Sequence, residues 1–181
     1  MDRALFLDRD GVLNVDHGYI GAIERFDPIP GVFEALTRAI ALDYRLIVIT
    51  NQSGIARGYF SAAEYAAVER HMIELFAAHA IHFSGIYHCP HHPGGVWSEL
   101  AVTCDCRKPA PGMILRACIE HDIDPARSVL VGDKMSDLAA GRAANVGHCF
   151  LVGAAPQGPT AFRSLRDLVI SPTFDMIARA T

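Results

Sequence analysis

The sequence has no long apolar run, no marked excess of charge of one sign and no repeated or low-complexity segment. Its apolar runs are far shorter than the roughly 20 residues that a membrane span requires, and its first residues lack the apolar core of a secretory signal. With 16 basic and 20 acidic residues, it offers no positive surface suited to nucleic acid. We therefore expect a cytoplasmic protein that binds neither a membrane nor nucleic acid.

Five of the 181 residues are cysteines. A reducing cytosol disfavours structural disulfides. The odd number and uneven spacing favour metal ligation by some cysteines and burial of the others. Cys118 and Cys149 stand apart from the rest, and we expect both to pack as small apolar side chains.

Short apolar runs alternate along the chain with segments of helical period, which predicts βαβ units. Three runs are apolar on both faces, as buried parallel strands are, and three are weaker strand candidates. The strong runs are residues 4–7, 46–49 and 129–131, and the weaker ones are residues 85–87, 149–152 and 168–170. The pattern predicts an α/β fold with a doubly wound, mostly parallel, Rossmann-like sheet. We expect residues 1–181 to form one domain and the protein to be a monomer.

Helix signals lie between these runs. Ser61 and Glu64 form a capping box at the start of a long helical pattern. Pro111 is expected to begin a helix and Ser136 to cap another. On the helix after Pro111, the side chains expected to face inward are Ile114, Leu115, Cys118 and Ile119. The glycine- and proline-rich residues 153–159 are expected to form a loop.

Ligands of such sheets bind beyond the carboxyl ends of the strands, so the residues that follow each strand carry the functional information. Asp8 and Asp10 follow the first strand, and a carboxylate pair at this place suits a divalent cation. Thr50 ends the second strand, and neutral side chains suited to phosphate oxygens follow it. These are Asn51, Gln52 and Ser53.

Charged residues complete the set. Lys108 can act as a point charge on a phosphate, and Arg107 can offer a planar fork to a second anionic group. Asp133 and Asp137 follow the third strong strand, one helical turn apart. Each feature alone is also typical of an ordinary polar turn, and it is their combination and order that indicate one site.

With these residues in place, the chain resembles the haloacid dehalogenase superfamily of phosphohydrolases. The resemblance rests on residues 8–12, Thr50, Lys108 and residues 132–137, with Val12 where many members have threonine. It implies that Asp8 attacks phosphorus to form an aspartyl-phosphate and that Asp10 is the general acid and base. It also implies that Thr50 and Lys108 stabilise the transferring phosphoryl group. The magnesium ligands that it implies are the carboxylates of Asp8 and Asp133 and the backbone carbonyl of Asp10.

Three longer segments, residues 8–19, 50–58 and 104–112, resemble the heptose 1,7-bisphosphate 7-phosphatases. The histidinol-phosphate phosphatases share much of this pattern and remain the alternative. The resemblance implies removal of the 7-phosphate of the β-heptose bisphosphate, a small sugar phosphate used in lipopolysaccharide synthesis.

The sequence leaves no room for a large cap domain over the site. The candidate substrate-binding residues are Asp16, His17, Gly18, Tyr19, Asn51, Gln52, Ser53, Arg107 and Lys134.

A second metal site is predicted within residues 88–107. Cys89-Pro90-His91 and Cys104-Asp105-Cys106 supply three thiolates and one imidazole across a twelve-residue spacer, which suits a closed structural zinc site. His88 and His92 compete with His91 for the imidazole position, and the family resemblance favours His91.

Two other classes of protein share part of this pattern. A phospho-accepting signalling module also places an aspartate at a strand end with magnesium, but an acid/base two residues away would hydrolyse its phosphorylated state. A zinc-dependent nucleic-acid binder would need a basic face, and this chain is net acidic.

Overall fold

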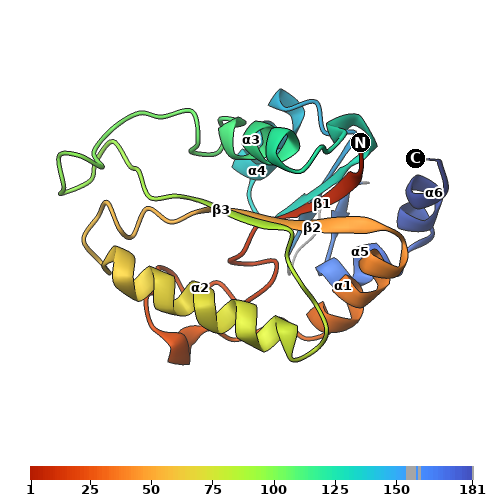
Figure 1. The fold of residues 1–181 in the computed structure, drawn as a ribbon, viewed down its shortest axis with the longest axis horizontal. Helices are drawn as coiled ribbons and strands as arrows, with labels where there is room; N and C mark the ends of the chain where they lie inside the picture. Colours follow the sequence, from red (N-terminus) through yellow and green to blue (C-terminus); the bar gives the residue numbers. More distant parts are fainter. Residues whose placement is uncertain (154–157, 159, 181) are drawn as a thin grey trace.

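The centre of the computed structural model, which describes residues 1–153, 158 and 160–180, is a parallel sheet of six strands (Figure 1). The strand order is β3-β2-β1-β4-β5-β6, and every neighbouring pair is parallel. The strands are β1 (Arg3–Leu7), β2 (Tyr44–Asn51), β3 (Gly85–Cys89), β4 (Val129–Gly132), β5 (His148–Val152) and β6 (Ala161–Phe162). The expected α/β fold with a doubly wound sheet is confirmed.

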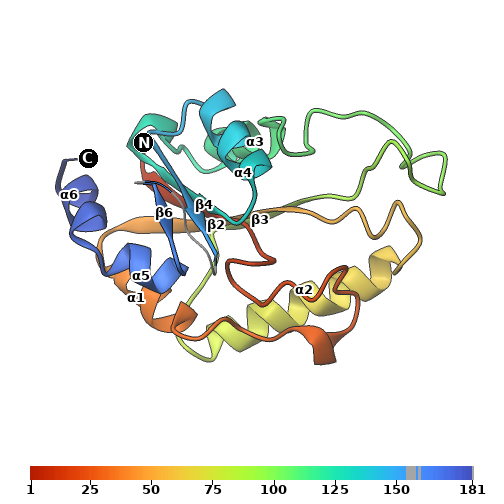
Figure 2. The ribbon, with the colours of Figure 1, turned by 180° about the vertical axis from the view of Figure 1, so that it is seen from behind.

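Helices cover both faces of this sheet. In Figures 1 and 2, α1, α2 and α5 lie on one side, and α3 and α4 lie on the other. The helices are α1 (Val32–Ala41), α2 (Ala62–Ala77), α3 (Gly112–Glu120), α4 (Met135–Ala143), α5 (Leu165–Val169) and α6 (Pro172–Ala180). Within the described residues, none of these helices is long and apolar enough to cross a membrane.

The central strands are buried on both faces because their side chains alternate between two cores. Leu5 and Leu7 of β1 belong to the core under α1 and α2, whereas Ala4 and Phe6 belong to the core under α3 and α4. All four are fully buried. This arrangement explains why the sequence of β1 is continuously apolar rather than alternating.

The capping box predicted at the start of α2 is present. The backbone N–H of Glu64 donates to Oγ of Ser61 at 3.1 Å, and the backbone N–H of Ser61 donates to Oε2 of Glu64 at 2.6 Å. Two backbone donors that the helix itself cannot satisfy are thereby paired, an arrangement worth about 1 kcal/mol.

Two sequence predictions of secondary structure were wrong. The run at residues 168–170 is not a strand: α5 covers Leu165–Val169, and Ser164 caps it by accepting from the N–H of Asp167. Ser136 does not cap α4, which begins at Met135 after Lys134. The side chain of Asp137 instead accepts a hydrogen bond from the N–H of Lys134 at 2.9 Å.

The inward face of α3 also differs from the prediction. Helix α3 follows Pro111 as expected, and Ile114 is buried, but Leu115 is 43% exposed and Ile119 is 83% exposed. Met113 and Ala117 take their places in the core. The loop expected at residues 153–159 falls largely outside the described residues.

The connections that follow β2 and β3 contain no large inserted domain. A single helix, α2, links β2 to β3, and a long loop follows β3 before α3 begins. This loop extends beyond the sheet beside the segment that leads into α2 (Figure 1). The expected fold without a large cap domain, with an inserted cysteine-containing loop, is confirmed.

Candidate active site

The carboxyl ends of β1 and β4 bring three carboxylates together. Asp8 follows β1, Asp133 follows β4 and Asp137 lies on α4, and each offers an oxygen within 4.8 Å of the others. Gly11 makes room for them: it has φ +84°, and a Cβ at this position would lie 2.5 Å from Oδ2 of Asp133. The turn that directs Asp8 inward therefore requires glycine.

Lys108 lies between two of these carboxylates. Its Nζ is 3.1 Å from Oδ1 of Asp8 and 2.7 Å from Oδ1 of Asp137, and it donates to the backbone carbonyl of Ile49 at 2.7 Å. All three charged side chains are nearly inaccessible to solvent. Burial alone would lower the pKa of Lys108, but Asp8 and Asp137 together raise it, so the ammonium stays charged.

Burial has the largest effect on the pKa values of Asp8 and Asp133. It raises the pKa of Asp8 despite the opposing charge of Lys108, and it raises the pKa of Asp133 to about 6, to which the negative charge of Asp8 also contributes. Oδ1 of Asp133 is buried and accepts no hydrogen bond. A buried carboxylate oxygen without a partner, beside two further carboxylates, fits a hard divalent cation such as Mg²⁺, which would favour the ionised forms.

Asp10 has a different environment. Its Oδ1 accepts from the side-chain amide of Asn14 at 2.9 Å, and its Oδ2 accepts from the amide of Gln52 at 3.0 Å. The guanidinium of Arg9 donates to both oxygens. Gln52 also donates to Oγ1 of Thr50 at 3.0 Å, which links the ends of β1 and β2. Arg9 and Asn14 thus belong to this site, although the sequence did not predict either of them as a site residue.

A cavity of about 420 Å³ opens beside these groups. It brings together most of the residues that the sequence analysis assigned to substrate binding. His17 is not among the lining residues; its ring contacts the carboxylate of Asp27 at 2.6 Å. The predicted residues that line the cavity are Asp10, Asp16, Gly18, Tyr19, Asn51, Gln52, Ser53, Arg107, Lys108 and Lys134.

Several of these side chains position one another. The amide group of Asn51 pairs with both backbone groups of Lys108, accepting from its N–H at 3.1 Å and donating to its carbonyl at 3.0 Å. Lys134 contacts Asp16 at 3.1 Å and Asp133 at 3.4 Å, which ties the loop after β1 to the start of α4. Asn51 therefore fixes Lys108 rather than standing free in the cavity.

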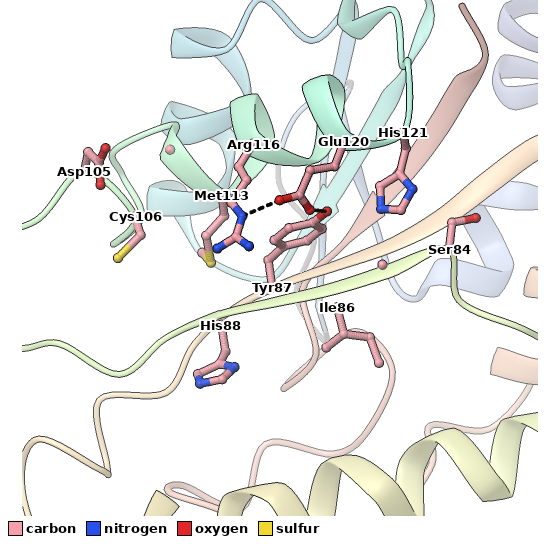
Figure 3. A pocket seen from close by; sticks show the side chains of 12 residues that line it. Ser84, Ile86, Tyr87, His88, Asp105, Cys106, Met113, Arg116, Glu120 and His121 are labelled. Carbon is pink, nitrogen blue, oxygen red and sulfur yellow. Dashed lines mark hydrogen bonds and ion pairs between the residues drawn. The ribbon is translucent and has the colours of Figure 1, made fainter.

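A larger cavity, of about 600 Å³, lies outside the sheet edge at β3 and lacks this chemistry (Figure 3). The hydroxyl of Tyr87 donates to Glu120 at 2.6 Å, and Arg116 donates to the same carboxylate at 2.7 Å. The charges of Arg116 and Glu120 therefore satisfy each other. The smaller cavity is therefore the candidate active site.

The loop after β3 gathers a second cluster of metal-binding side chains. Sγ of Cys106 lies 3.2 Å from the sulfurs of both Cys89 and Cys104, and Nδ1 of His91 lies 3.3 Å from Sγ of Cys106. Ligands of one tetrahedral zinc with bonds of about 2.3 Å would stand roughly 3.8 Å apart, close to these spacings. The four residues could therefore hold zinc.

The two competing histidines lie elsewhere. His88 packs on the ring of Tyr65, with ring centroids 4.4 Å apart, and its Nδ1 is 4.0 Å from Glu69. Nε2 of His92 contacts the guanidinium of Arg57 at 2.7 Å. Of the three candidates, His91 is the one that joins the cysteines.

Comparison with known proteins gives the family. A family model described as HAD-hydrolase-like matches residues 105–166. The D-glycero-β-D-manno-heptose-1,7-bisphosphate 7-phosphatase of Pasteurella multocida is 48% identical over 152 residues, which cover 84% of this chain and 82% of that protein. The enzyme of the same name from Escherichia coli K12 is 43% identical over 173 residues, covering 96% of this chain and 91% of that protein.

A solved structure agrees. The D,D-heptose 1,7-bisphosphate phosphatase of B. bronchiseptica, in complex with magnesium and phosphate, superposes with a TM-score of 0.79 at 28% identity. The match covers 99% of each chain. Taken with the carboxylates and lysine at the strand ends, these matches identify the chain as a phosphatase that belongs to the haloacid dehalogenase-like hydrolases.

Proposed function

We propose that this phosphatase removes the 7-phosphate of D-glycero-β-D-manno-heptose 1,7-bisphosphate, a step toward the ADP-heptose used in the lipopolysaccharide core. The observation that carries the proposal is the placement of the buried Lys108 between Asp8 and Asp137, beside a cavity that Arg107 and Lys134 also line. The names of relatives up to 48% identical supply the substrate.

In the proposed reaction, an oxygen of Asp8 attacks phosphorus and forms an aspartyl-phosphate as the ester bond breaks. The carboxylic acid of Asp10 gives its proton to the leaving alkoxide. Asp10 then removes a proton from a water molecule, which attacks phosphorus of the aspartyl-phosphate, releases inorganic phosphate and regenerates the carboxylate of Asp8. Thr50 and Lys108 face the oxygens over which the negative charge spreads.

Magnesium would be held by Asp8 and Asp133, with the backbone carbonyl of Asp10 as a further ligand. When bound, it would neutralise phosphate charge that otherwise repels the attacking carboxylate. The donors around Asp10 suit a carboxylate that acts as a base. To act as the acid, Asp10 must carry a proton on an oxygen that now accepts from Arg9, Asn14 or Gln52.

Arg107 and Lys134 are proposed to hold the phosphate that is kept, since both line the cavity and their side chains bind groups other than Asp8. Arg107 donates to the backbone carbonyl of His91 at 3.2 Å. Zinc on Cys89, His91, Cys104 and Cys106 would therefore fix the loop that carries Arg107 and Lys108. We propose that this zinc is structural, because all four tetrahedral positions are filled by protein ligands.

The proposed substrate also supports the cytoplasmic location expected from the sequence. A sugar carrying two phosphates is too highly charged to cross a lipid bilayer unaided. An enzyme that consumes it must therefore share a compartment with the enzymes that make it.

The test is kcat/KM, measured in magnesium, for the β-anomer of heptose 1,7-bisphosphate, its α-anomer and histidinol phosphate side by side. A preference of about a hundredfold for the β-anomer, worth roughly 2.7 kcal/mol at the transition state, would support the proposal. Equal or better turnover of histidinol phosphate would contradict the substrate assignment and leave the phosphatase chemistry intact.

A further inference from the structure

Arg9 is a buried arginine between two catalytic candidates. Its side chain is 1% exposed, and it is among the largest fully buried side chains of the described residues. Burying a guanidinium costs several kcal/mol unless it is well paired, so such a residue needs a specific partner. The chemistry proposed above assigns Arg9 no role.

The partner is Asp10. Nε of Arg9 donates to Oδ1 of Asp10 at 3.1 Å, and one terminal nitrogen donates to both oxygens of Asp10 at 2.9 Å. A planar fork that contacts both oxygens fixes the rotation of the carboxylate as well as its position. Asn14 and Gln52 each contact one oxygen, so neither could hold this orientation alone.

Tyr65 of helix α2 also contacts the guanidinium of Arg9. The central carbon of the guanidinium lies 5.7 Å from the ring centroid of Tyr65, within the range of a cation–π contact. Tyr65 is 2% exposed, and its hydroxyl donates to Glu69 at 2.7 Å. The ring of Tyr65 is therefore fixed in place against the guanidinium of Arg9.

The backbone of Arg9 acts on the nucleophile. Its N–H donates to Oδ1 of Asp8 at 2.7 Å, and its carbonyl accepts from the N–H of Leu13 at 2.8 Å, within the turn that follows β1. The main chain of Arg9 thus orients Asp8, while its side chain orients Asp10.

We propose that Arg9 is a positioning residue, whose side chain holds the Asp10 carboxylate where a proton can pass between it and the leaving alkoxide. The inference rests on the role proposed for Asp10. Proton transfer requires the two heavy atoms to lie within hydrogen-bond reach, and a freely rotating carboxylate meets this condition only part of the time. Replacement of Arg9 should therefore lower kcat/KM more for a substrate whose leaving group needs a proton than for one whose leaving group does not.

The experiment compares Arg9→Met with the wild type on two esters through kcat/KM, which reports the steps up to departure of the leaving group. For the heptose bisphosphate, whose alkoxide needs a proton, we expect a fall of about a hundredfold. For p-nitrophenyl phosphate, whose phenolate leaves without one, we expect a fall of less than about tenfold. With this ester, Arg9→Met should release a burst of p-nitrophenolate in the first turnover. The burst is expected because Asp10 also acts in the hydrolysis of the aspartyl-phosphate, which then becomes the slow step.

Arg9→Lys keeps the positive charge but not the planar fork of the guanidinium. Its kcat/KM for the alkyl ester should lie between those of the wild type and Arg9→Met. Arg116→Met, at an exposed arginine that pairs with Glu120, is the matched control and should change neither rate. Equal losses on both esters would reduce Arg9 to a structural role, and no loss on either would exclude it from positioning.

The substrate proposal is tested separately by the same assay. If the wild type rejects the heptose bisphosphate but hydrolyses another alkyl phosphate, the substrate assignment fails, and the comparison with p-nitrophenyl phosphate is made with that ester. If Arg9→Met does not fold, the Arg9→Lys protein carries the same comparison, and equal losses there would overturn the proposal.

Discussion

The ammonium of Lys108 lies 3.1 Å from a carboxylate oxygen of Asp8, and both groups are buried. Desolvation of the two charges is costly, and their attraction offsets it only because hydrogen bonds complete the arrangement. The backbone carbonyl of Ile49 accepts from Lys108, and the N–H of Arg9 donates to Asp8. This pair holds the proposed nucleophile against the strand end before any substrate binds.

Asp8→Asn should abolish turnover and keep the fold. An amide cannot form the aspartyl-phosphate, so we expect kcat to fall by roughly a thousandfold or more. Lys108 keeps Asp137 as its counter-ion, so the free energy of unfolding should change by less than about 2 kcal/mol. The measurements are steady-state kinetics and urea unfolding.

Asp43→Asn is a suitable control, since Asp43 is exposed and has φ +59°, a conformation that asparagine also adopts readily. It should leave both quantities unchanged. Retention of activity by Asp8→Asn would remove Asp8 from the role of nucleophile.

The raised pKa of Asp133 should make the metal-free protein less stable at neutral than at mildly acidic pH. The folded protein holds this proton up to about pH 6, whereas an aspartate exposed to water has a pKa of 3.8. The contribution to stability is therefore fully present below about pH 4 and is lost as the pH rises through about 6. Its upper limit is about 3 kcal/mol, at roughly 1.4 kcal/mol for each pKa unit.

Urea unfolding in EDTA between pH 4.5 and 7.5 measures this effect against Asp133→Asn, which has no such proton. The wild type should lose more stability than the variant across this range. Parallel curves for the two proteins would show that the environment of Asp133 does not penalise its charge.

Magnesium should be needed for turnover and should reverse this penalty. EDTA is expected to silence the enzyme, and excess Mg²⁺ to restore it, because the cluster of Asp8, Asp133 and Asp137 would otherwise repel a phosphate dianion. At pH 7.5, Mg²⁺ at 100 times its dissociation constant should raise the free energy of unfolding by about 2.7 kcal/mol. Full activity in EDTA would exclude the metal from the reaction.

The sequence predicted the strands and the residues at their ends because both follow from local patterns. A continuous apolar run such as residues 4–7 marks a strand covered on both faces. Parallel strands then bring Asp8, Thr50 and Asp133 to one edge of the sheet, whatever the details of the loops. The spacing also gave the three cysteines of the zinc cluster, whereas the choice of His91 over His88 and His92 rested on the family resemblance.

Features that depend on tertiary contacts were missed. Residues 168–170 are apolar, but Ser164 caps a short helix here, and a run of this length fits either structure. Ile119 is 83% exposed because the helix packs through Met113 and Ala117 instead. The sequence gives no sign of a role for Arg9 between its two aspartates, since nothing in it shows that Tyr65, from a distant helix, packs against this arginine.

Freshly purified protein should contain about one zinc per chain, bound by the cluster in the loop after β3. Cys104→Ser should lower the zinc content and the kcat, because the loop that the cluster organises leads directly into Arg107 and Lys108. Cys118→Ser is the matched control: Cys118 packs against the core outside the zinc cluster, so the variant should keep its zinc and its kcat. Elemental analysis measures the zinc content of each protein, and steady-state kinetics measures its kcat. Zinc-free wild type that is fully active would reduce the cluster to packing, whereas zinc loss with unchanged kcat would uncouple the loop from Lys108.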